Sequence, residues 1–213
     1  MKKSLLFGLV GFTLTHAALA ANSIYLESYL SDPTPLITYG ANVYANGKYG
    51  AFGVEGTGLD SNWTVGIYFA AGVVTGDPTT GNGSVSSQLS LATGPNSTAQ
   101  LDPTLAPGAI TAGTFVASGY FDTGLPFGST ITVELVAYPT VDGSYENAIL
   151  WGDPRGHSAA FRMPTQPSPA YIPNYVGDYF SSFSVALVPE PGISALMGLC
   201  SASVLLGLRR RKT

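Results

Sequence analysis

Residues 63–74 read Trp-Thr-Val-Gly-Ile-Tyr-Phe-Ala-Ala-Gly-Val-Val, and they alternate with a period of two. Trp63, Val65, Ile67 and Phe69 fall on one face of an extended chain, and smaller or partly polar residues fall on the other. Successive side chains of a β-strand point to opposite faces of its sheet. The segment therefore predicts a strand with one apolar face against a core and a second face that is smaller and partly polar.

The same alternation recurs along the chain. It is clear over residues 131–138 and 182–187, and weaker over residues 24–30, 49–55, 85–92, 114–121 and 156–163. Each segment is rich in β-branched or aromatic residues and is bounded by Gly, Pro, Asn or Asp, which is the signature of a strand. Only residues 144–151 suggest a short helix. We expect an all-β fold, a two-sheet antiparallel β-sandwich of immunoglobulin-like or jelly-roll type, whose final strand over residues 179–188 packs in the core.

The N-terminus has the layout of a secretory signal peptide. Met1-Lys2-Lys3 is positively charged, residues 5–15 are apolar, and Ala18 and Ala20 supply the small residues of a cleavage site. We expect residues 1–20 to be removed after Ala20, following export through the Sec translocon. The alternatives are a buried N-terminal helix and an uncleaved anchor.

The C-terminus is built in the opposite order. Pro189-Glu190-Pro191 interrupts regular structure, residues 192–208 are apolar, and Arg209, Arg210 and Arg211 begin a basic end. The apolar run is at the short end of what crosses a bilayer, so it predicts a C-terminal transmembrane helix. The basic cluster is expected to stay in the cytoplasm. With the leader also starting inside, the body over residues 21–188 is then translocated.

These C-terminal features in this order resemble the PEP-CTERM family of exosortase substrates, which are exported surface proteins of Gram-negative bacteria. The residues that carry the resemblance are Pro189, Glu190 and Pro191, the apolar run, and Arg209, Arg210 and Arg211. The resemblance implies that a membrane-embedded exosortase recognises the motif, cuts near it and leaves the tail behind. It also implies a precursor anchored in the inner membrane and a product at the cell surface or in the extracellular matrix. The alternative is an ordinary anchor after a proline-rich stalk.

The body between the two ends is strongly acidic. Six of the nine basic residues lie in the ends: Lys2, Lys3, Arg209, Arg210, Arg211 and Lys212. Lys48, Arg155 and Arg162 remain, against twelve carboxylates from Glu27 to Asp178. Such a body lacks the phosphate-neutralising cations that nucleic-acid binding requires. The single cysteine, Cys200, lies in the apolar run, so the body forms no internal disulfide and no cysteine-based site.

Catalytic residues are not apparent in the body. His157, Ser158 and Asp153 or Asp178 supply the residue types of a nucleophilic triad, but adjacent residues of a strand point to opposite faces. No Gly-x-Ser-x-Gly elbow is present. A glycosidase-like carboxylate pair has no sequence feature that selects it. We therefore expect that the protein is not an enzyme, and a secreted hydrolase is the least favoured alternative.

Residues 77–84 are rich in oxygen ligands, but Thr79 and Gly81 occupy positions where an EF-hand needs acidic or amide side chains. We favour a surface turn and expect neither metal nor cofactor, with an isolated calcium site as the alternative.

Tyrosines provide the best indication of a binding role. They occur early and late in the body, at Tyr25, Tyr29, Tyr39, Tyr44 and Tyr49 and at Tyr171, Tyr175 and Tyr179. Exposed rings with polar neighbours can stack on sugars, whereas the alternative is that they fill the rims of the sandwich. We expect a structural or adhesive protein of the exopolysaccharide or envelope layer, with a carbohydrate-binding module as the alternative.

Overall fold

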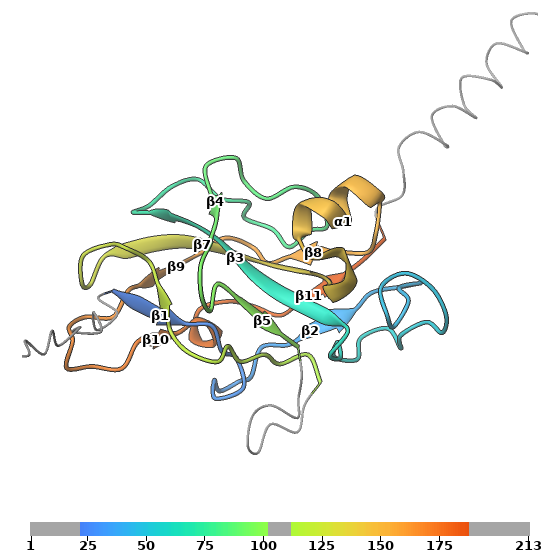
Figure 1. Ribbon diagram of the computed structural model, residues 1–213, viewed down its shortest axis with the longest axis horizontal. Coiled ribbons are helices and arrows are strands. Elements are labelled where there is room, and N and C mark those ends of the chain that lie inside the picture. The colour runs from blue at the N-terminus through green and yellow to red at the C-terminus, as the bar shows by residue number, and fades with distance from the viewer. Residues whose placement is uncertain (1–21, 102–111, 188–213) are drawn as a thin grey trace, which may run out of the picture.

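The computed structural model describes residues 22–101 and 112–187 (Figure 1). Within these ranges the chain forms strands in several sheets with little helix, which confirms the all-β prediction. No helix in the described ranges is long and apolar enough to cross a membrane. The predicted cleavage residues Ala18 and Ala20, the motif at Pro189–Pro191, the apolar run and the basic end lie outside these residues.

The largest sheet is organised around one long antiparallel pair. β3 (Trp63–Ala71) pairs with β7 (Thr130–Pro139) over nine residue pairs, from Trp63 opposite Pro139 to Ala71 opposite Ile131. Four shorter strands extend this pair: β4 (Ser90–Leu91) and β5 (Thr98–Gln100) beside β3, and β8 (Gly156–His157) and β9 (Phe161–Pro164) beside β7. The alternating segment that begins at Trp63 is therefore an interior strand of the largest sheet, beside β7.

Two smaller sheets join the ends of the body to each other. In the first, β1 (Ser23–Tyr25) lies between β10 (Asn174–Tyr175) and β6 (Phe121–Asp122). In the second, β11 (Phe183–Val185) pairs with β2 (Ile37–Tyr39). The pairs β1–β10 and β11–β2 are parallel, so the prediction of a purely antiparallel fold is wrong. Parallel pairing requires a long connection, which strands from opposite ends of the body provide.

One apolar cluster draws residues from all three sheets. Trp63, Val65 and Ile67 of β3 are fully buried in it, as the alternation predicted. Phe183 and Val185 of β11 also lie in this cluster, which confirms that the final strand packs in the core. The indole of Trp63 donates to the carbonyl oxygen of Ala45 at 3.0 Å, so its polar atom is satisfied inside the core.

The second face of the central pair is covered rather than open to water. The predicted helix is present as α1 (Tyr145–Trp151), capped by Ser144, whose Oγ accepts from the Asn147 N–H at 3.1 Å. Its Tyr145 and Ala148 form a second apolar cluster with β3 and β7 side chains. A 3₁₀ turn, η1 (Thr140–Asp142), precedes α1, and another, η2 (Val176–Asp178), follows β10.

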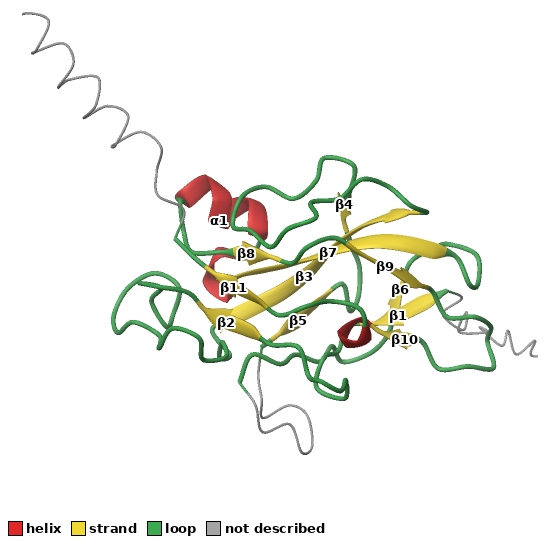
Figure 2. Cartoon of the chain, turned by 180° about the vertical axis from the view of Figure 1, so that it is seen from behind, coloured by secondary structure: helices red, strands yellow, loops and turns green. Residues whose placement is uncertain are grey.

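The weaker strand predictions had mixed outcomes. Residues 24–30, 85–92, 114–121 and 156–163 contain or border only the short strands β1, β4, β6, β8 and β9. Residues 49–55 form no strand, and Phe52 makes only an isolated bridge to Tyr44. Gly47, Gly50 and Gly56 adopt positive φ angles there, which breaks extended pairing. Long loops accordingly connect many of the strands in Figure 2.

Candidate functional site

A group of tyrosine rings forms where β1 is paired on both sides. The parallel register of β1 and β10 places Tyr25 opposite Tyr175. On the other side, β1 pairs with β6, and Tyr120 directly precedes β6. The Tyr25 ring meets Tyr120 edge-to-face at 5.1 Å between centroids and Tyr175 at 5.8 Å. We call Tyr25, Tyr120 and Tyr175 the tyrosine cluster.

The tyrosine cluster faces solvent. The Tyr120 side chain is 47% exposed, and Tyr25 and Tyr175 are half-buried. Partial burial, assisted by neighbouring tyrosines and by Glu27, raises the pKa of both Tyr25 and Tyr175. A tyrosine hydroxyl is protonated at neutral pH even without such a shift, so each phenol can both donate and accept a hydrogen bond. The rings offer apolar surface together with polar hydroxyls.

Glu27 is a buried carboxyl beside the tyrosine cluster. Its Oε1 accepts from the Leu30 N–H at 2.6 Å, and its Oε2 is buried with no hydrogen-bond partner among the described residues. Burial is the main cause of a raised pKa for Glu27, and the charge of Asp178 adds to it. Desolvation disfavours the charged form of a buried carboxyl, which gives the shift this direction. Glu27 therefore lies near Tyr25 and Tyr175 with one carboxyl oxygen that has no hydrogen-bond partner among the described residues.

The sequence identified only part of this site. It singled out Tyr25, Tyr29 and Tyr175 but missed Tyr120 and Glu27. The alternation Tyr25-x-Glu27-x-Tyr29 is a signal for Glu27, because residues two apart in an extended segment share a face. Tyr29 is close enough to raise the pKa of Tyr25.

The other predicted tyrosines do not belong to the cluster. Tyr39 is buried beside Trp63 in the main core, and its hydroxyl donates to the Ala45 carbonyl at 3.2 Å, so it is neither an exposed ring nor a rim residue. Tyr44 stacks on Phe52 at 4.5 Å. Tyr49, Tyr171 and Tyr179 are exposed and make no ring contact among the described residues.

The residues of the imagined triad are engaged in structural contacts. His157 is 2% exposed, and its Nδ1 lies 2.9 Å from the Ser158 carbonyl oxygen. The Ser158 side chain is fully buried and its Oγ accepts from the Leu135 N–H at 3.0 Å. Asp153 pairs with Lys48 instead of His157. The geometry does not assemble these side chains into a nucleophile, a base and an orienting acid.

Two carboxylates, on Asp142 before α1 and on Asp153 after it, approach each other. Asp142 and Asp153 each lie 2.9 Å from the Lys48 ammonium, which also sits 4.5 Å from the centre of the Trp151 ring. Burial raises the pKa of Asp142, and Lys48 opposes that rise. Neither carboxylate lines the neighbouring cavity of about 450 Å³. The arrangement is that of an ion-paired cluster rather than of two acids facing a substrate.

The oxygen-rich segment at residues 77–84 is an irregular loop with bends, and its Gly81 forms an isolated antiparallel bridge to His157 instead of the expected surface turn. Asp77 Oδ1 accepts from the Thr79 N–H at 2.9 Å and from its hydroxyl at 2.8 Å. These bonds hold the pKa of Asp77 below its usual value. Within residues 22–101 and 112–187, no three His, Cys, Asp or Glu side chains come together in a metal-binding group.

Comparison with known proteins identifies no relative. No family model matches the chain, and neither a curated protein nor a solved structure gives a significant match. The PEP-CTERM resemblance therefore stays a prediction.

Proposed function

We propose that this chain is an exported protein of the cell surface or extracellular matrix that adheres to polysaccharide through the tyrosine cluster. The observation that carries the proposal is the mutual contact of three partly exposed tyrosine rings, each with a hydroxyl, at β1 and its two neighbouring strands. Binding sites for small ligands combine apolar or aromatic surface with a few convergent polar groups. The sugar ring supplies both an apolar C–H face and hydroxyls, so it matches this combination.

Packing of the rings on one another favours binding over a purely structural role. An edge-to-face pair fixes the orientation of Tyr120 and Tyr25, so little side-chain freedom is lost when a ligand binds. At 47% exposure, Tyr120 keeps much of its surface available. An adhesive role requires many such weak contacts along a polymer, and multivalent attachment multiplies their effect.

The proposed route to the surface uses both ends of the chain. Residues 1–20 act as a signal peptide, and residues 189–213 act as a sorting signal with a transmembrane helix that an exosortase removes. The body is proposed to be a sandwich, with the six-stranded sheet as one layer and the two small sheets as the other. The apolar cluster shared by all three sheets supports this arrangement.

Affinity electrophoresis tests the adhesive role. The chain is run through native gels with and without the polysaccharide secreted by the cells that make it. We expect retardation of the wild type and a loss of most of it in Tyr120→Ala. The matched control is Tyr171→Ala, which removes a tyrosine that is 65% exposed and lies outside the cluster. An unretarded wild type, or equal losses in the two variants, would contradict the proposal.

A further inference from the structure

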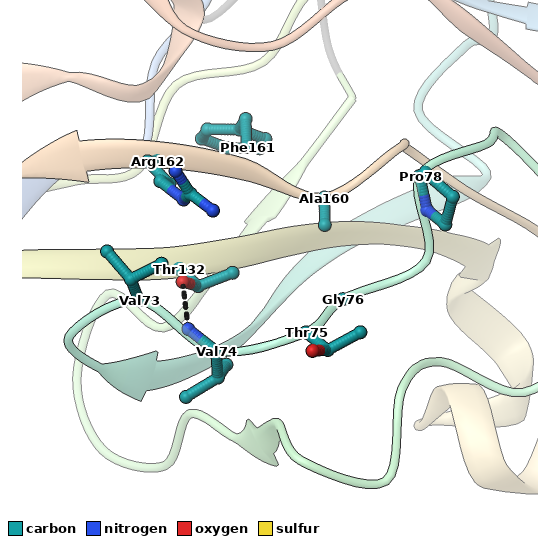
Figure 3. Close-up of a pocket in the computed structure, with 9 residues that line it drawn as sticks. All are labelled: Val73, Val74, Thr75, Gly76, Pro78, Thr132, Ala160, Phe161 and Arg162. Carbon is teal, nitrogen blue, oxygen red and sulfur yellow. Dashed lines mark hydrogen bonds between the residues drawn. The ribbon is translucent and has the colours of Figure 1, made fainter.

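A cavity of about 550 Å³ lies between the segment after β3 and the segment that enters β9, and Thr132 of β7 contributes to its wall. Figure 3 shows Val73, Thr75 and Gly76 on one side, Arg162 and Ala160 on the other, and Thr132 of β7 between them. The volume falls within the range of natural small-ligand sites. This cavity uses none of the residues of the tyrosine cluster.

The walls of the cavity are held by hydrogen bonds to the sheet. The Val74 N–H donates to Thr132 Oγ1 at 3.1 Å, and the Asp77 N–H donates to Oε1 of the buried Glu134 at 2.6 Å. The Ala160 N–H donates to the Asp77 carbonyl oxygen at 2.6 Å, which ties the two sides together. The cavity is therefore preformed, and a ligand need not order its walls.

Arg162 is the cation of the described residues that remains free to bind an anion. Lys48 is paired with two carboxylates. Arg155 is buried and donates to the carbonyl oxygens of Ala148 and Asp153. Arg162 is exposed at the cavity, and it has no ion pair or side-chain hydrogen bond within residues 22–101 and 112–187.

Asp77 is the nearest acidic residue in sequence to the cavity wall, and its carboxylate is occupied elsewhere. Its Oδ1 accepts two hydrogen bonds from Thr79, and its Oδ2 lies 3.9 Å from His157 Nε2. No ion pair joins Asp77 to Arg162 among the described residues. Glu134 lies behind the wall at Gly76, where its Oε1 accepts from the Asp77 N–H, and it forms no ion pair with Arg162 in the described structure either. The Arg162 guanidinium is therefore available to a ligand carboxylate.

We propose that this cavity binds a hexuronate residue of an acidic polysaccharide. The planar guanidinium of Arg162 matches a carboxylate in a two-point hydrogen-bonded pair. Val73, Ala160 and Pro78 provide apolar surface for the C–H face of the sugar ring, and the Thr75 hydroxyl is available to a sugar hydroxyl. The inference deepens the proposed polysaccharide function by naming a sugar class, and it depends on that function for its ligand.

The test is isothermal titration of the full chain in detergent micelles. The probes are trisaccharides of galacturonate, glucuronate and mannuronate, each also as its neutral methyl ester. We expect at least one acid to bind, and its ester to bind at least tenfold more weakly. Arg162→Gln should lower the affinity for the acid by the same factor. Arg162→Lys keeps the charge without the planar guanidinium, so it should lower that affinity less.

Tyr120→Ala is the matched variant at the other site and is expected to leave this binding unchanged. Because Arg162 is exposed and has no described partner, its substitution should leave thermal unfolding unchanged. Absence of binding by all three acids, equal binding of acid and ester, or unaltered binding by Arg162→Gln would overturn the inference. A loss in Tyr120→Ala alone would also overturn it while leaving the proposed adhesive function intact, since gel retardation tests that function separately.

Discussion

Replacing Ser158 by alanine tests whether Ser158 stabilises the fold as a buried hydrogen-bond acceptor, as opposed to serving as a nucleophile. The change removes one oxygen, and that oxygen accepts the Leu135 N–H at 3.0 Å in the buried centre of the sheet. A buried donor that loses its acceptor costs about 1–3 kcal/mol. For a domain of this size, each kcal/mol lowers Tm by roughly 2–4 °C, so the expected fall is about 2–12 °C.

The assay is thermal and urea unfolding of residues 22–187, with circular dichroism as the signal that monitors each transition. Ser184→Ala is the matched control, because Ser184 is exposed on β11 and its side chain has no partner in the described structure. The urea midpoint of Ser158→Ala should fall with an unchanged m-value, which identifies a change in stability rather than in compactness. Equal stability of the two variants would refute the assignment of Ser158 as a structural acceptor.

Two further predictions concern Glu27 and a tightly packed glycine. Because burial raises the pKa of Glu27 above its ordinary 4.5, the folded state retains a proton that the unfolded chain has lost, and the free energy of unfolding falls as pH rises through that window. The side chain in Glu27→Gln does not titrate, so the free energy of unfolding of this variant should rise relative to that of the wild type from pH 4.5 upward. Urea unfolding at a series of pH values measures this difference. A difference that does not change with pH would contradict the raised pKa. A Cβ at Gly58 would lie 1.8 Å from the Ala112 carbonyl oxygen, so Gly58→Ala should destabilise by about 1–3 kcal/mol or more. Gly83→Ala, where nothing lies within 4 Å, should be near neutral, and similar melting of the two variants would argue against the close contact.

The sequence predicted the parts of the fold that depend on local pattern. β3 and β7 alternate over many residues, which defines their buried faces. The ends of α1 are marked by Ser144 before it and Gly152 after it. The short edge strands were predicted too long. A strand of two or three residues has too few positions for alternation to define its ends.

Pairing between distant segments left no local signal. β1 and β10 meet from opposite ends of the body, so nothing near Tyr25 indicates that Tyr175 lies beside it. Tyr120 was missed for the same reason. Glu134 of β7 is fully buried, and its Oε1 accepts a hydrogen bond from the N–H of Asp77 in the loop after β3. Burial of a polar residue depends on what the rest of the chain places over it.

The mass of the mature protein tests the central claim, export with removal of both ends, most directly. The protein is collected from the surface and medium of the cells that make it, and its intact mass is measured. We expect a product that begins at Ala21 and ends near Pro189, well below the 22.1 kDa of the full chain. Deletion of Pro189–Pro191 should leave the C-terminal tail attached and the protein in the membrane. Recovery of the intact chain, or unchanged processing after that deletion, would contradict the account.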